Sequence, residues 1–206
     1  MRQSQARITA VLLAAGDGTR FAGPTHKLLS PLRGLPLYQH ALNAVIGSGI
    51  ASIVVVTGAV DLVVPEGITV VHNPRWNTGQ RSSVLAGITA ARGSDAVVFG
   101  LADQPFVTSQ SWQDVASATS PISIATYDGI RAHPVRLGLE LWDEFIASTT
   151  EPDEGLRSFT RQRSQIVQEV ACLGSLADID TLEDLERWTS IIISLCPCQL
   201  IRPGQS

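Results

Sequence analysis

Four continuous apolar runs constrain the fold of this chain most strongly, because each is rich in β-branched residues and none alternates regularly with polar positions. The runs are Ile8 to Ala14, Ser52 to Thr57, Ile68 to Val71 and Ala96 to Leu101. Continuous apolar strands of this length are typical of a parallel sheet that is covered on both faces. The pattern therefore predicts a sheet with helices on both sides.

Helix-like segments separate these runs, and helices are predicted over residues 37–45, 83–91 and 109–117. Pro36 suits the first turn of the first helix, and Ser109 could cap the third. Repeated alternation of strand and helix predicts an α/β fold, a doubly wound and mostly parallel sheet in a three-layer α/β/α arrangement of Rossmann-like type.

The alternation weakens after Tyr127. Helices are expected over residues 138–146 and 155–162, and a strand over residues 165–170. Thr181-Leu182-Glu183-Asp184 has the form of a capping box, which predicts a final helix. We expect a single domain over residues 1–190, followed by a C-terminal tail of residues 191–206.

Composition narrows the classes of function. The net charge of −4 argues against a nucleic-acid surface, and the aromatic content of 5% against stacking platforms for single strands. No apolar stretch reaches the roughly 20 residues of a membrane span. The polar N-terminus does not resemble a signal peptide, and three cysteines cannot form a fully paired disulfide framework. We therefore expect a cytoplasmic enzyme with no nucleic-acid or membrane partner.

The segment after the first run, Leu13-Ala14-Ala15-Gly16-Asp17-Gly18-Thr19-Arg20-Phe21, is the most informative part of the sequence. Gly16 and Gly18 allow backbone N–H groups to turn toward an anion, and the two alanines allow close approach of a ligand. Arg20 and Lys27 could neutralise phosphate oxygens. The loop is neither a Walker A motif nor a dinucleotide fingerprint. An ordinary glycine-rich turn with solvated charges is the alternative.

Asp103 directly follows the run that ends at Leu101, so it should project from the carboxyl edge of the sheet. A carboxylate there would repel a triphosphate unless a divalent cation lay between them. Mg²⁺ suits that position because it bridges carboxylates and phosphates. Elsewhere, Trp76 is expected to pack and His40 to be structural, and Cys196-Pro197-Cys198 is taken as part of an incidental tail.

Several motifs occur in one order along the chain. They are the LAAG-x-G-x-R-F segment with Lys27-Leu28-Leu29, Asn73-Pro74-x-Trp76-x-x-Gly79, Leu101-Ala102-Asp103-Gln104-Pro105, His133-Pro134-Val135, Gly155-Leu156-Arg157 and Asp178-Ile179-Asp180-Thr181. Together they resemble the MobA-like nucleotidyltransferases, and more closely the molybdenum cofactor cytidylyltransferase branch of that family.

The resemblance implies the roles of individual residues. Asp103 and Asp180 would hold Mg²⁺, with Asp178 left open, and Arg20, Lys27 and Asp103 would be catalytic. His133 and Arg157 would lie on the acceptor side, together with the other arginines of the segment 131–136. The nucleotide would contact residues of the glycine-rich loop and of the later Gly79 segment: Leu13, Ala14, Ala15, Gly16, Gly18, Lys27, Gly79 and Ser83.

Three hypotheses of function follow. The first is Mg²⁺-dependent transfer of a nucleotidyl group, with CTP as donor and molybdopterin or its molybdenum complex as the small anionic acceptor. The second is NADH- or NADPH-dependent reduction of a quinone-like pyridine dye, because relatives in this branch bear the name nicotine blue oxidoreductase. The third is a noncatalytic chaperone that delivers molybdenum cofactor to a partner molybdenum enzyme. Fold and family alone do not decide among them.

Overall fold

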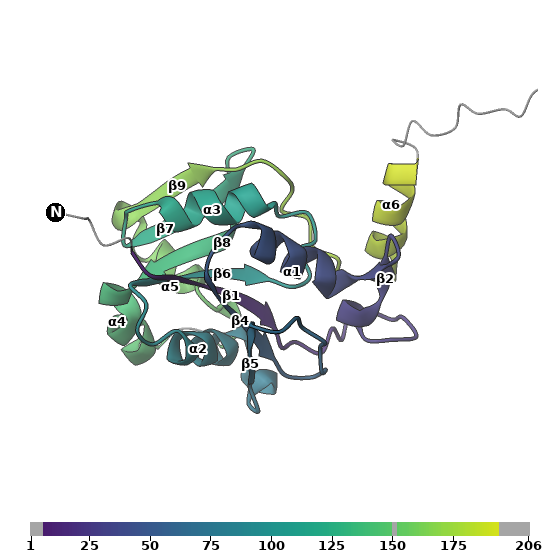
Figure 1. Cartoon of the computed structure of the whole chain (residues 1–206), viewed down its shortest axis with the longest axis horizontal. Coiled ribbons are helices and arrows are strands. Elements are labelled where there is room, and N and C mark those ends of the chain that lie inside the picture. The colour runs from purple at the N-terminus through teal and green to yellow at the C-terminus, as the bar shows by residue number, and fades with distance from the viewer. Residues whose placement is uncertain (1–5, 150–151, 194–206) are drawn as a thin grey trace, which may run out of the picture.

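A seven-stranded sheet forms the centre of the protein, whose computed structural model describes residues 6–149 and 152–193 (Figure 1). The strands lie in the order β5-β4-β1-β6-β8-β7-β9. Their bounds are β1 Ile8–Ala14, β4 Ser52–Thr57, β5 Thr69–His72, β6 Ala96–Leu101, β7 Ile122–Tyr127, β8 Ile130–Gly138 and β9 Val167–Ala171. A separate two-stranded ribbon pairs β2 (Pro31–Leu32) with β3 (Leu35–Pro36).

The four strands β5, β4, β1 and β6 are parallel, and they are the four predicted from continuous apolar runs. Three of them have the predicted bounds, and β5 begins one residue later than predicted. The predicted helices are also confirmed, as α1 (Leu37–Gly47), α2 (Gln80–Ala90) and α3 (Ser109–Ser117). Ser109 is not the cap of α3: the Thr108 side chain accepts the hydrogen bond from Ser111 N, and Ser109 is already helical.

The antiparallel hairpin of β7 and β8 was not predicted. β8 pairs antiparallel with both β6 and β7, and β9 lies parallel to β7 at the sheet edge. The helix predicted from Gly138 was placed too early, because Gly138 ends β8 and a 3-10 turn precedes α4 (Trp142–Ala147). α5 (Arg157–Arg161) and β9 fall close to their predicted positions.

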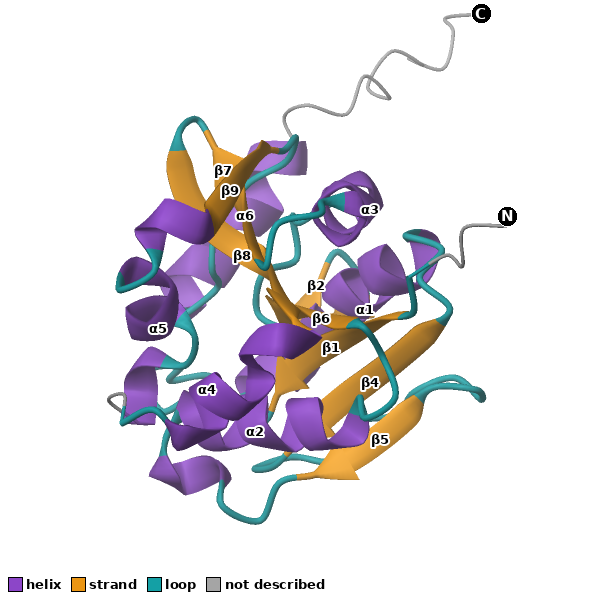
Figure 2. Cartoon of the chain, turned by 90° about the vertical axis from the view of Figure 1, so that its left-hand side faces the viewer, coloured by secondary structure: helices purple, strands orange, loops and turns teal. Residues whose placement is uncertain are grey.

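Helices cover both faces of the sheet, so the predicted three-layer α/β/α arrangement is confirmed (Figure 2). α1 and α3 pack on one face, and α2, α4 and α5 pack on the other. Along β1, Ala10 and Leu12 enter the first core while Val11 and Leu13 enter the second. Successive side chains of a strand point to opposite faces, so a strand covered on both sides is apolar without alternation.

α6 (Leu182–Ile193) begins at the capping box that the sequence predicts. Asp184 N donates to Thr181 Oγ1 at 3.1 Å, and Thr181 N donates to Asp184 Oδ2 at 2.9 Å. Just upstream, Ile179 N donates to Asp103 O at 3.1 Å, which ties this segment to the end of β6.

Residues 194–206, including Cys196 and Cys198, lie outside the described residues. Within the ranges 6–149 and 152–193, no helix has the length and apolar character that a membrane crossing needs.

Candidate active site

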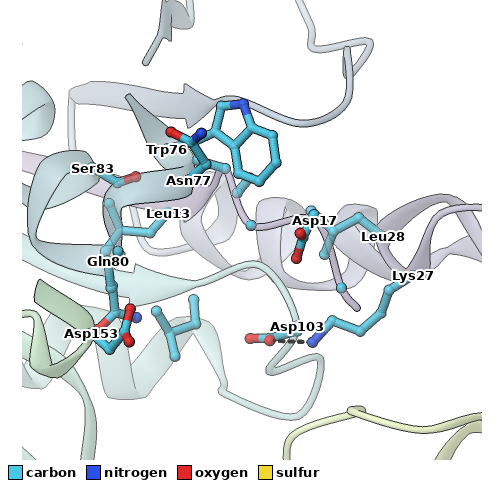
Figure 3. Close-up of a pocket in the computed structure, with 16 residues that line it drawn as sticks. Leu13, Asp17, Lys27, Leu28, Trp76, Asn77, Gln80, Ser83, Asp103 and Asp153 are labelled. Atoms are coloured by element: carbon cyan, nitrogen blue, oxygen red, sulfur yellow. Dashed lines mark hydrogen bonds and ion pairs between the residues drawn. The ribbon is translucent and has the colours of Figure 1, made fainter. Parts of the chain in front are cut away.

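A cavity of about 340 Å³ opens at the carboxyl ends of β1 and β6, and we call it the first cavity (Figure 3). The predicted nucleotide contacts share this location. Lining residues from that prediction are Leu13, Ala14, Ala15, Gly16, Gly18, Lys27, Gly79 and Ser83, joined by Asp103. The structure therefore brings the glycine-rich loop, the Gly79 segment and the end of β6 around one space.

Lys27 lies at the centre of a cluster of charges beside this cavity. Its Nζ donates to Asp103 Oδ2 at 2.7 Å and to Asp180 Oδ1 at 3.0 Å. Arg20 forms an ion pair with the other oxygen, Asp180 Oδ2, at 3.0 Å. The Lys27 side chain is only 10% exposed, whereas that of Arg20 is 75% exposed. Residues far apart in sequence thus form one network of two cations and two carboxylates, which we call the charge cluster.

Gly18 explains how Lys27 comes so close to the loop. Gly18 has a φ of +66°, and a Cβ at this position would lie 2.9 Å from Lys27 Cβ. A side chain here would be strained by the backbone conformation and would push Lys27 away. His26 contributes by accepting from Leu28 N and by contacting Gly16 O through Nε2 at 3.1 Å.

The charge cluster favours the charged form of Lys27. Burial alone would lower the pKa of Lys27, but the contacts with Asp103 and Asp180 outweigh it and raise that pKa above its ordinary value. The ammonium group is therefore a fixed positive charge at neutral pH.

The carboxylates fit the expected metal. Asp103 Oδ1 is buried and has no hydrogen-bond partner among the described residues, so this oxygen is available to a ligand. No group of three or more His, Cys, Asp or Glu side chains suited to a metal occurs in the described ranges. Two carboxylates are nevertheless a usual protein contribution to Mg²⁺, which takes its other ligands from phosphates and water.

A second cavity of about 650 Å³ adjoins the first, and the two share Gln80, Leu101 and Asp153 as lining residues. His133 and Arg157, the two predicted acceptor-side residues, both line it. Burial lowers the pKa of His133 to about 4; Asp103 opposes the shift and Arg157 adds to it. The His133 ring is therefore neutral at pH 7.

One expectation about a charged residue needs correction, and the structure also shows where Asp178, which the sequence left open, is held. Arg136 does not line the second cavity, because it follows Val135 on β8 and points to the opposite face, where it donates to Ser120 O. Asp178 does not join the charge cluster: its Oδ1 accepts from Gln104 Nε2 at 2.6 Å. Burial raises the pKa of Asp178, and the hydrogen bond from Gln104 opposes the shift.

Among the polar lining residues that had no predicted role are Gln80, Gln104 and Asp153. Gln104 follows Asp103 directly in sequence, and this position could have predicted that it lies near the site. Gln80 and Asp153 become neighbours of the site only through the packing of α2 against the turn that contains Asp153. Of the structural expectations, Trp76 packs against the core and also lines the first cavity, and His40 Nε2 contacts Leu32 O at 2.7 Å.

The fold is that of nucleotidyltransferase structures, and the first cavity lies at the carboxyl edge of the doubly wound sheet. The chain belongs to the MobA-like NTP transferase family, whose domain model matches residues 10–167.

The chain is also similar to a protein of another name along most of its length, and to solved structures of the same fold. A nicotine blue oxidoreductase of Paenarthrobacter nicotinovorans is 34% identical over 197 residues, which cover 87% of this chain and 95% of that protein. A nucleotidyl transferase from Methanothermobacter has a similar structure, with a TM-score of 0.75, 23% identity and coverage of 92% of this chain and 99% of that one. The Mycobacterium tuberculosis protein Rv0371C, solved in complex with manganese, has a TM-score of 0.73, 22% identity and coverage of 89% and 98%.

Proposed function

We propose that this protein transfers a nucleotidyl group from a nucleoside triphosphate to a small anionic acceptor and releases pyrophosphate. The observation that carries the proposal is the charge cluster, in which Lys27 bridges Asp103 and Asp180 beside the glycine-rich loop. A buried cation and carboxylates at the carboxyl ends of strands suit phosphate chemistry, in which positioning and neutralisation of charge supply most of the rate enhancement.

The triphosphate is proposed to bind in the first cavity. The backbone of Gly16 and Gly18 faces the phosphates there, and Lys27 supplies a buried positive charge. Arg20 is exposed enough to move from Asp180 to a phosphate oxygen, where its planar group can form paired hydrogen bonds.

Asp103 and Asp180 are proposed to hold the divalent cation. When bound, Mg²⁺ would neutralise the negative charge of the phosphates. The free oxygen of Asp103 supports this role. The manganese complex of the structurally similar Rv0371C is consistent with a divalent cation in this fold.

The acceptor is proposed to occupy the second cavity, where Arg157 would hold its negative charge. An oxygen of an acceptor phosphate attacks the α-phosphorus, and the bond from the α-phosphorus to the β-bridging oxygen breaks, so that pyrophosphate leaves. An ionised phosphate oxygen carries no proton, so the attack needs no general base. CTP and molybdopterin are the proposed donor and acceptor, on the basis of the family resemblance.

The test is pyrophosphate release by the purified protein with each of the four NTPs, Mg²⁺ and a molybdopterin preparation. We expect release with one NTP at a rate that depends on both Mg²⁺ and acceptor. If no NTP yields pyrophosphate above the rate without protein, the proposal is wrong.

A second candidate is the reduction of a pyridine dye by NADH or NADPH, which the 34% identity to a nicotine blue oxidoreductase over nearly its whole length favours. In this case the first cavity would hold the dinucleotide pyrophosphate and the second cavity the dye. The reduction predicts oxidation of NAD(P)H coupled to loss of dye colour, with no requirement for Mg²⁺. A clean preparation that shows no coupled oxidation would remove this candidate.

A further inference from the structure

Gln104 lines the second cavity, and the oxygen of its side-chain amide forms no hydrogen bond among the described residues. It follows Asp103 at the end of β6, and the whole residue is only 5% exposed. Its Nε2 donates to Asp178 Oδ1 at 2.6 Å. Its Oε1 is buried and has no hydrogen-bond partner among the described residues. A buried acceptor without a hydrogen-bond donor is unfavourable. A ligand that donates a hydrogen bond to Oε1 would therefore bind more tightly than one that does not.

Asp178 fixes which end of the amide is available. A carboxylate oxygen accepts hydrogen bonds and an amide nitrogen donates them, so the nitrogen of Gln104 must face Asp178. A flipped amide would bring two acceptor oxygens together. Asp178 is itself held in place, because the next residue, Ile179, donates its N–H to Asp103 O at 3.1 Å. Oε1 is therefore the atom that Gln104 can offer to a ligand.

Gln104 and Asp178 both line the second cavity. The same cavity has apolar walls, including Ile124, Val135 and Leu156. Three arginines also line it. Arg131 and Arg161 pair with Glu169 and Glu154, whereas Arg157 forms no ion pair among the described residues. These features suit a compact, mainly apolar ring system that carries an N–H or O–H donor for Gln104 and an anionic group for Arg157.

We propose that Gln104 Oε1 selects acceptor substrates that present a hydrogen-bond donor, and that Asp178 is the positioning residue that keeps this oxygen available. The substrate class is then a ring-bearing anion with an N–H or O–H group, such as a lactam carboxylate or lactam phosphate. The proposal rests on the proposed function only in taking the second cavity as the acceptor site, and it is tested by binding without any nucleotide. A site that hydrogen-bonds a donor discriminates strongly against an analogue that lacks it.

The probes are 6-oxo-1,6-dihydropyridine-3-carboxylate, which has a ring N–H, and its N-methyl analogue, which lacks this donor. Their dissociation constants would be measured by ligand-observed NMR titration. We expect the wild-type protein to bind the N–H probe about tenfold more tightly than the methylated probe.

Four variants test the hydrogen bond from Gln104, the positioning by Asp178 and the charge of Arg157 separately. Gln104→Leu should reduce the ratio of the two dissociation constants to about twofold or less. Asp178→Ala should also reduce the ratio, while Asp178→Asn, which keeps an oxygen acceptor for Gln104 Nε2, should restore it. Arg157→Gln should weaken both probes equally and leave the ratio unchanged. Thermal unfolding identifies any variant that does not fold. If Gln104→Leu does not fold, the Asp178 variants test the same hydrogen bond, and if they do not fold, Gln104→Leu does.

The proposal is overturned if the wild-type protein binds both probes equally, if it binds neither at about 10 mM, or if Gln104→Leu keeps the wild-type ratio. These outcomes are independent of pyrophosphate release. A protein that discriminates between the probes and transfers no nucleotide would contradict the proposed function alone.

Discussion

The two adjoining cavities are built in different ways. The first lies at the ends of parallel strands, and its walls come from a glycine-rich loop and a charge cluster. The second lies beside the antiparallel hairpin of β7 and β8, and combines apolar side chains with Arg157 and a neutral His133. Under the proposed function, the first cavity would bind the phosphates of the nucleotide and the second cavity would bind the acceptor. We infer that the chemistry belongs to the first cavity and substrate choice to the second.

Asp103→Asn should produce the largest effect, because it removes a carboxylate charge from the first cavity. We expect pyrophosphate release to fall about 10²–10³-fold, the usual cost of losing a main electrostatic contributor. The rate of pyrophosphate release at saturating NTP and Mg²⁺ measures this loss of activity. Asp143→Asn, on an exposed position of α4, is the matched control. A normal rate with Asp103→Asn would place the chemistry elsewhere.

Lys27→Met should change stability and its response to metal. Without the ammonium group, Asp103 and Asp180 lose their shared partner, and the free energy of unfolding should fall by about 1–3 kcal/mol. Mg²⁺ should recover more stability in this variant than in the wild type, because it can take the place of the lost cation. Chemical unfolding with and without Mg²⁺ measures both effects. An equal response of the two proteins to Mg²⁺ would contradict the expectation that Mg²⁺ takes the place of the Lys27 ammonium group.

Arg157→Gln tests whether the second cavity binds the acceptor and not the nucleotide. It should raise the KM for the acceptor about tenfold, the effect of losing one charge-assisted hydrogen bond, while the KM for the nucleotide stays within about twofold. Steady-state kinetics with each substrate varied in turn separate the two. Arg92→Gln, exposed at the opposite end of the sheet, is the control. A larger change in nucleotide KM than in acceptor KM would reverse the assignment of the cavities.

His133, which lines the second cavity, predicts a pH dependence of the stability of the protein. Its pKa is near 4 in the folded protein, below the ordinary 6.5, so the unfolded chain binds a proton between these values that the folded protein does not. Stability should therefore fall as the pH drops from about 6.5 to about 4. His133→Gln should lessen this loss by about 1 kcal/mol, less than the full shift because the residue is not completely buried. Unfolding curves at several pH values would show no difference between the proteins if His133 is already solvated.

Lys27 also provides a direct signal for occupancy, since it is the only lysine in the sequence. A protein labelled with ¹⁵N-lysine has a single side-chain ammonium group to observe. We expect this signal to shift on addition of NTP with Mg²⁺ and to change little with the pyridine carboxylate probe. A shift of equal size with the probe alone would show that the two cavities do not act separately.

The sequence predicted the first cavity far better than the second, for physical reasons. The parallel strands are buried on both faces, so their apolar runs were unambiguous, and the loop after β1 keeps its functional residues close together in sequence. The hairpin of β7 and β8 includes polar residues such as Arg131 and Arg136, which hid its strand pattern. Asp178 illustrates the remaining gap: its partner is Gln104, 74 residues away, and only the packed structure shows this.

The central claim is that a metal–nucleoside triphosphate binds in the first cavity. The most direct test is a crystal structure of the protein with Mn²⁺ and the α,β-methylene analogue of CTP, which cannot transfer its nucleotidyl group. We predict an anomalous Mn²⁺ peak in contact with Asp103 and Asp180, and a triphosphate along Gly16 to Arg20. A Mn²⁺ ion and triphosphate bound away from Asp103, or a first cavity that takes NADPH and excludes this analogue, would contradict the claim.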